Sequence, residues 1–233
     1  MNIAFASDMR TIDERVVGEY GLPALALMEN AGRRTAEETV SLIGSARGKS
    51  VCVFAGGGNN GGDALAVARL LTNEGYKVRT YLFNITNHLS DDCVTNRQRL
   101  LDGRHAKDFT EITAKFDPPE LTADTLVIDG LFGSGLNKPL AGGFASLVKY
   151  INQSPAKVVS IDVPSGLMSE DNTYNVRANI IHATLTLTLH EKKLAFLFGD
   201  AQQFIGRLKV LDIRLSQEYI QKTEAQSVSY THL

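Results

Sequence analysis

From Ser50 onward, short apolar runs alternate with helical segments. The apolar runs that predict strands occupy residues 51–55, 77–83, 125–130, 157–162, 183–189 and 208–215. Helical segments are expected at 64–75, 90–102 and 142–152. The runs are apolar at nearly every position, which is typical of strands covered on both faces. Because strands that alternate with helices favour βαβ units, we predict an α/β fold with a mainly parallel sheet.

The chain before Ser50 is helical in pattern from Asp8 to Ile43, with a break at Gly21-Leu22-Pro23. The residues after Leu215 are polar, and they could fray or begin a linker. We therefore expect one domain over residues 1–215 and a polar tail or linker over 216–233.

Composition narrows the class of protein. A chain of 233 residues fits one large domain, and its formal charge of −2 gives no general attraction to nucleic acid or to anionic membranes. It has no apolar stretch of about 18 residues, as a membrane helix needs, and its start lacks a signal-peptide pattern. The two cysteines, Cys52 and Cys93, form no CxxC pair and no zinc spacing. These features predict a cytoplasmic protein without a nucleic-acid or membrane partner.

The most distinctive motif is the glycine-rich segment GGGNNGGD at 56–63, which lies between a predicted strand and a predicted helix. Its glycines match G-x-G-x-x-G, and a helix N-terminus behind such a loop suits a phosphate. Asn59 and Asn60 add uncharged donors and acceptors. The alternative is a tight turn in which Asp63 caps the helix.

Two common nucleotide-binding motifs do not fit this segment. A Walker loop needs Lys and Ser or Thr after the glycines, where this chain has Asp63. A dehydrogenase needs an acidic residue near the end of the second strand to hold the ribose. Here that strand ends at Phe83, and no acidic residue follows it until Asp91. The sequence therefore disfavours a hydride-transfer enzyme.

Two further strand ends carry polar loops. In VIDGLFGSGLNKPL (127–140), Asp129 ends the strand, and Lys138 either meets a phosphate or is a solvated loop residue. In VVSIDVPSGL (158–167), Asp162 ends the strand, where a carboxylate can serve as an acid/base or cap the loop.

Asn60, Asp129 and Ser165 supply oxygen atoms from three strand ends. Hard cations prefer oxygen ligands, and the low charge of this set suggests a monovalent ion. Ser165 lies in P-S-G-L rather than G-x-S-x-G, so a hydrolase triad is not indicated. His190, Lys192 and Lys193 follow the fifth predicted strand and could reach the same rim, although exposed turn positions are favoured for His190 and Lys192.

Taken together, LMENAGR (27–33), GGGNNGGDALAVARLL (56–71), VIDGLFGSGLNKPL (127–140) and VVSIDVPSGL (158–167) strongly resemble the YjeF N-terminal domain family over residues 8–215. The resemblance implies a Rossmann-like three-layer α/β/α sandwich that is commonly a homodimer. It also implies NAD(P)H-hydrate (NAD(P)HX) epimerase activity. Such an isomerase interconverts the R and S epimers of NADHX and NADPHX and so repairs damaged nicotinamide cofactors.

The same resemblance implies roles at matched positions. Asn60, Asp129 and Ser165 would coordinate a potassium ion, while Asp162 and Lys193 would be catalytic, with Asp162 as the acid/base. The residues that would bind NADHX or NADPHX are Asn59, Asn60, Gly61, Gly62, Asp63, Gly133, Ser134, Gly135, Leu136, Asn137, Lys138, Pro139 and Asp162. A separate ATP- or ADP-dependent NAD(P)HX dehydratase would consume the S epimer.

The late segment departs from the family pattern. The family motif T-F-G-x-P-K is replaced by TLHEKKL (188–194), which puts His190 and Glu191 where small residues are usual. Two alternatives to a stand-alone epimerase stay open. One is a non-catalytic nucleotide-binding or scaffold module of the same fold, and the other is the N-terminal half of a bifunctional epimerase/dehydratase.

Overall fold

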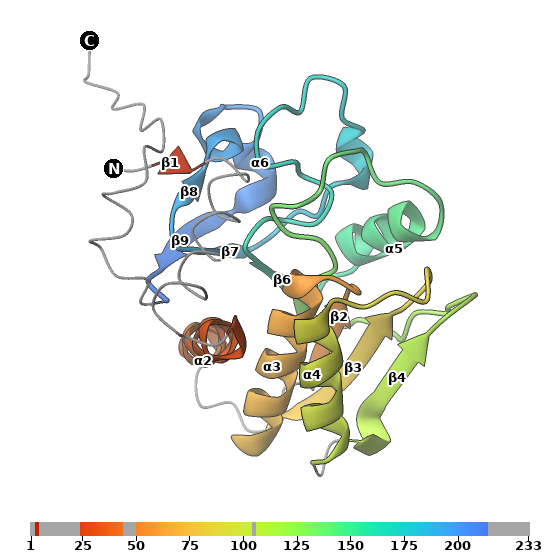
Figure 1. Cartoon of the computed structure of the whole chain (residues 1–233). Helices are drawn as coiled ribbons and strands as arrows, with labels where there is room; N and C mark the ends of the chain where they lie inside the picture. Colours follow the sequence, from red (N-terminus) through yellow and green to blue (C-terminus); the bar gives the residue numbers. More distant parts are fainter. Residues whose placement is uncertain (1–2, 5–23, 44–49, 104–105, 214–233) are drawn as a thin grey trace.

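The computed structural model describes residues 3–4, 24–43, 50–103 and 106–213. Seven parallel strands form the main sheet in the order β4-β3-β2-β5-β6-β7-β9 (Figure 1). The strands are β2 (Ser50–Ala55), β3 (Lys77–Phe83), β4 (Phe109–Ile112), β5 (Thr125–Gly130), β6 (Lys157–Ile161), β7 (Leu185–Leu189) and β9 (Arg207–Leu211). A second, two-stranded parallel sheet pairs β1 (Ile3–Ala4) with β8 (Lys192–Lys193). This arrangement confirms the predicted α/β fold.

Helices lie on both faces of the main sheet. Three of them pack together on one face and α5 lies on the other (Figure 1). The helices are α2 (Ala24–Ile43), α3 (Asn59–Asn73), α4 (Asp91–Leu101), α5 (Gly142–Gln153) and α6 (Gln202–Ile205), with 3₁₀ turns η1 (Ala106–Asp108), η2 (Arg177–Asn179) and η3 (Leu194–Leu197). No helix among the described residues combines the length and the apolarity needed to cross a membrane.

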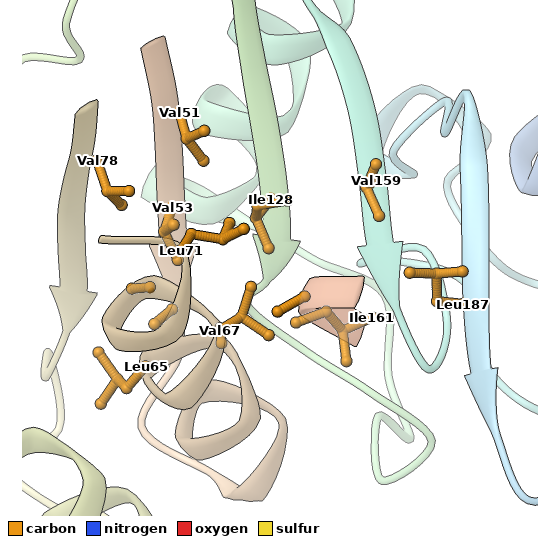
Figure 2. Packing of buried hydrophobic residues seen from close by; sticks show 14 of the residues in the cluster. Val51, Val53, Leu65, Val67, Leu71, Val78, Ile128, Val159, Ile161 and Leu187 are labelled. Carbon is orange, nitrogen blue, oxygen red and sulfur yellow. The ribbon is translucent and has the colours of Figure 1, made fainter. Parts of the chain in front are cut away.

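The alternating directions of side chains along β2 build the two halves of the core. Val51 and Val53 pack in one cluster with Val67 of α3 (Figure 2). Cys52 and Phe54 point to the opposite face and join the cluster that contains the buried residues of α5. Both faces of the strand are therefore removed from water, which explains why the run is apolar at every position.

The largest difference from the sequence prediction is the start of α3. The helix begins at Asn59 rather than at residue 64, and its N-cap is Gly58, so Asp63 lies inside the helix and does not cap it. The two glycines at 61 and 62 mimic a loop in sequence, but both are buried in the first turn. Gly75 has a φ of +89° after the last turn, as expected for a helix-ending glycine.

Short elements with few buried positions escape a periodicity search. β4 has four residues, of which only Ile112 is buried, and β8 has two. The helix expected before Gly21 and the polar tail after Leu215 lie outside the described residues.

The strand order reverses between β2 and β5. After β2 the chain proceeds outward through β3 and β4, and it then returns to pair β5 against the other side of β2. Ligands of doubly wound sheets bind in the crevice outside the carboxyl ends of the strands at such a point. At this point the backbone amide of Gly56 donates to the carbonyl oxygen of Gly130 at 3.0 Å.

Two glycines in the same motif should respond differently to alanine. A Cβ at Gly61 would lie 1.7 Å from the carbonyl oxygen of Gly56, whereas a Cβ at Gly58 would meet nothing within 4 Å. We expect Gly61→Ala to lower the free energy of unfolding by about 3 kcal/mol or more through overpacking. Gly58→Ala, the matched control, should change it by no more than about 0.5 kcal/mol. Urea denaturation measures both, and equal effects would contradict this account of the loop.

Candidate functional site

A cleft of about 1000 Å³ lies across the carboxyl ends of the central strands. It is lined by the segments that follow β3, β2, β5, β6 and β7, together with residues of α2. Of the binding residues that the sequence predicts, those that line the cleft are Asn59, Asn60, Asp63, Gly133, Ser134, Gly135, Leu136, Asn137, Lys138 and Asp162. Gly61 and Gly62 lie beneath the surface of the cleft, and Pro139 also does not line it.

An ion pair stands at one end of the cleft. The Nζ of Lys193 lies 2.7 Å from Oδ1 of Asp162, with the two side chains 1% and 10% exposed. The backbone amide of Ser134 donates to the other carboxylate oxygen at 2.9 Å. Burial alone would raise the pKa of Asp162, but the Lys193 ammonium and the Ser134 amide outweigh it and hold that pKa below its ordinary value. Asp162 is therefore a carboxylate at neutral pH.

The Lys193 ammonium is held by one ion pair and two hydrogen bonds. Besides Asp162, it donates to the carbonyl oxygen of Leu189 at 2.9 Å and to that of Glu191 at 3.2 Å. A charged group out of water needs an opposite charge and hydrogen bonds of this kind to be stable. The structure thus brings the two predicted catalytic residues together and fixes their orientation.

Two residues in left-handed backbone conformation form this end of the site. Asp162, directly after β6, has a φ of +64°, and His190, directly after β7, has a φ of +62°. Asp and His are among the residue types that tolerate this region best. The reversal after β6 aims the Asp162 carboxylate at the lysine that follows β7. This strand-end geometry could not be read from the sequence.

Asp129 is fully buried beneath the cleft floor. One of its carboxylate oxygens accepts from the Ser160 hydroxyl at 2.8 Å and the Ser165 amide at 2.9 Å, and the other accepts from the Ser165 hydroxyl at 2.5 Å. Burial raises the pKa of Asp129 above its ordinary value, although these hydrogen bonds act to lower it. Ser160, which the sequence analysis did not single out, is part of this cluster.

Asn60 presents a buried amide with no partner among the described residues. Neither its Oδ1 nor its Nδ2 makes a hydrogen bond there. A Cβ on Gly133 would lie 3.0 Å from Cγ of Asn60 and 3.1 Å from Oδ2 of Asp162, so both side chains flank the same stretch of backbone. Buried polar atoms without partners are rare in folded proteins and mark sites where a ligand or ion supplies the missing contacts.

The apolar wall of the cleft was not predicted from the sequence. Phe83, Phe132 and Phe144 line it on one side, and Met28 of α2 lines it elsewhere. Single phenylalanines at a strand end, in a glycine loop and at a helix start carry no pattern of their own. The motif LMENAGR was recognised, but its position against the cleft was not foreseen.

His190 does not occupy the exposed turn position that the sequence favoured. It is partly buried and lines the cleft, and Lys192 is also partly buried because β8 is paired with β1. Burial first, and the neighbouring Lys193 ammonium second, lower the pKa of His190 to about 3. The imidazole is therefore neutral at physiological pH.

A doubly wound parallel sheet with a glycine-rich helix start at its reversal point defines a class of α/β protein typical of nucleotide binding. More particularly, the chain belongs to the YjeF-related protein N-terminus family, whose model matches residues 24–195.

Curated relatives cover most of the chain. It is 33% identical to a NAD(P)H-hydrate epimerase of Limosilactobacillus fermentum over 89% of this chain and 94% of that protein. It is 34% identical to a NAD(P)H-hydrate epimerase of Lentilactobacillus buchneri, over 88% and 91% of the two chains. A bifunctional NAD(P)H-hydrate repair enzyme Nnr of Salinibacter ruber is 35% identical over 89% of this chain but only 40% of its own length.

A solved structure supports the fold. The crystal structure of the yeast protein ynu0, YNL200c, matches with a TM-score of 0.75 at 20% identity and covers 95% of this chain and 93% of the yeast chain. At this level of identity the likeness concerns the fold alone.

His190 should make stability depend on pH. The unfolded chain binds a proton near the ordinary pKa of 6.5, whereas the folded histidine does so only near 3. Stability should therefore fall as the pH drops below 6.5, by about 2 kcal/mol at about pH 5 from this group alone. His190→Asn, which suits a left-handed position, should remove that part of the slope in urea denaturation at each pH. An unchanged slope would show that His190 is protonated in the folded protein.

Proposed function

We propose that this protein is a NAD(P)H-hydrate epimerase, an isomerase that interconverts the R and S forms of hydrated NADH and NADPH. The observation that carries the proposal is the buried Asp162–Lys193 ion pair in a cleft of about 1000 Å³. Relatives that bear this name, at about a third identity over nearly the whole chain, support it.

The charges of the cleft support one orientation of the substrate. The first turn of α3 points its backbone amides into the cleft, and the positive end of a helix dipole favours the diphosphate. Lys138 lines the same cleft and adds an exposed positive charge. The nicotinamide ring then lies at the Asp162 end, where the proton-transfer groups are.

Epimerisation at C6 of the hydrated ring must break and remake a C–O bond without net oxidation. The bonding pair leaves with the oxygen while the ring-nitrogen lone pair forms a C=N bond to C6. Asp162 delivers a proton to the departing hydroxyl, which leaves as water. Because Asp162 is ionised at rest, that proton comes from Lys193 across their 2.7 Å contact. Water then adds to the other face of C6, and its proton returns to the pair.

The Ser134 amide keeps Asp162 in place while the proton moves. It holds one carboxylate oxygen, and Lys193 holds the other. Lys193 is tied in turn to two backbone carbonyl groups, so neither side chain needs to reorganise. Fixed donors and acceptors of this kind lower the barrier because no reorientation is needed at the moment of reaction.

Asn60, Asp129 and Ser165 would hold a potassium ion in this proposal. The unpartnered amide of Asn60 and the buried carboxylate of Asp129, which has no basic side chain as a partner among the described residues, fit such an ion. The Ser165 hydroxyl accepts from the Phe132 amide at 2.9 Å while donating to Asp129, so it keeps one lone pair for a cation. The bound ion would neutralise Asp129 and tie the strand-end loops together.

Since the bifunctional relatives join two activities in one chain, we propose that an ATP- or ADP-dependent dehydratase is the functional partner that consumes the S epimer. The homodimer expected from the sequence stays a prediction. The scaffold alternative has less support, because a scaffold has no use for a buried lysine paired with a carboxylate in a cleft.

Asp162→Asn should abolish most of the turnover. The amide cannot relay a proton, so we expect kcat for conversion of R-NADPHX to its S epimer to fall by about 10²–10⁴-fold. Chromatography of the two epimers over time measures the rate above the uncatalysed background. Asp171→Asn, which changes an exposed carboxylate outside the cleft, is the matched control and should keep full activity.

Asp162→Asn also leaves the buried Lys193 ammonium without its counter-ion, so loss of stability must be separated from loss of catalysis. The double variant Asp162→Asn, Lys193→Met removes both charges and should regain part of the stability without regaining turnover. If either variant folded and kept the turnover of the wild type, Asp162 would not be the proton-transfer residue.

Potassium should stabilise the protein more than an equal concentration of sodium or choline chloride, because a ligand that binds only the folded state raises the melting temperature. Asn60→Leu should abolish that difference. Asn59→Leu, at the exposed neighbouring position, should keep it. Scanning calorimetry in the three salts is the measurement, and identical responses of the wild type to all three would count against the ion.

A further inference from the structure

One end of the cleft is aromatic, and the epimerisation described above makes no use of it. The rings of Phe132 and Phe144 meet edge to face with centroids 4.9 Å apart, and Phe83 lies 5.8 Å from Phe144. All three residues line the cleft, and Phe132 and Phe144 are partly exposed there. We call these three residues the aromatic wall.

The aromatic wall packs against further rings behind it. Phe116 contacts Phe83 edge to face at 5.1 Å, and Phe54 contacts it at 6.3 Å. Neither Phe116 nor Phe54 lines the cleft. The wall is thus the exposed edge of a larger aromatic cluster, and its rings do not need to move to receive a flat ligand.

The strand order sets the distance between the wall and the ion pair. Phe83 ends β3, whereas Asp162 follows β6, and β2 and β5 lie between them. Three strand spacings of about 4.8 Å place Phe83 roughly 14 Å from Asp162. Phe132 follows β5 and precedes Gly133, so the wall runs from Phe83 toward the ion pair, with Phe83 and Phe144 at its far part. The glycine-rich start of α3, which suits the diphosphate, follows β2 and therefore lies between the two ends.

We propose that the aromatic wall is the subsite for the adenine ring of the dinucleotide. This inference rests on the proposed function, which puts the nicotinamide at Asp162 and the diphosphate on α3. The second base must then lie at the β3 end, where phenylalanine rings supply stacking surface. An adenine in this position is held by stacking and edge contacts with the phenylalanine rings rather than by charge.

The proposal predicts which substrates the site distinguishes. The hydrate of reduced nicotinamide mononucleotide carries the reacting ring and one phosphate but no adenine. Phe144→Leu removes one ring of the wall while keeping an apolar side chain of similar size. It should raise KM for NADHX about tenfold with little change in kcat. KM for the mononucleotide hydrate should not change.

Phe116→Leu is the matched control, because it removes a ring from the same cluster at a position outside the cleft. It should leave KM for both substrates unchanged. If Phe144→Leu raised KM for the mononucleotide and the dinucleotide equally, or for neither, the adenine subsite would be overturned while the epimerase remained.

Direct binding separates this inference from the proposed function. In calorimetric titrations AMP should bind the wild type, and Phe144→Leu, but not Phe116→Leu, should weaken it about tenfold. This result would support the subsite even if the wild-type protein failed to accelerate epimerisation. Equal affinity of AMP for all three proteins would overturn it.

Discussion

Removing a lysine ammonium from water costs several kcal/mol unless its charge and its hydrogens are all satisfied. Lys193 is 1% exposed, and it meets this condition through Asp162 and two carbonyl oxygens. Removing any one of these partners would leave the buried ammonium without one of its contacts. The resulting loss of free energy is large compared with the marginal stability of a domain.

The fold brings the pair together through strand order rather than through sequence proximity. β6 and β7 are parallel neighbours, so their carboxyl ends emerge side by side, and left-handed residues follow both strands. β8, which carries Lys193, pairs with β1 at the other end of the chain. Glycines on the β2 and β5 loops let the two backbones touch, which keeps the glycine-rich start of α3 next to the loop that holds Asp162.

Much of the fold and of the candidate site could be predicted from the sequence. Nearly continuous apolar runs located the central strands, and polar residues at their ends located the cleft, because parallel strands present the same end on one edge. The start of α3 could not be predicted, since Gly61 and Gly62 look like loop residues until the contact with Gly56 is known. The place of His190 also depends on tertiary structure, because its backbone amide donates to the carbonyl oxygen of Leu211 in β9, which is distant in sequence. The aromatic wall is assembled from three separate segments and leaves no local pattern.

The central claim is that the cleft holds an ionised carboxylate beside a buried ammonium. The most direct measurement is the ¹³C NMR titration of the aspartate side chains, with the Asp162 signal assigned by its loss in Asp162→Asn. The account predicts that the Asp162 carboxyl group stays ionised down to about pH 4, because its pKa lies below the ordinary 3.8. In Lys193→Met the same signal should titrate at a higher pH, since burial then acts without the ammonium. A wild-type midpoint above 3.8, or one that the Lys193 substitution does not move, would contradict the account.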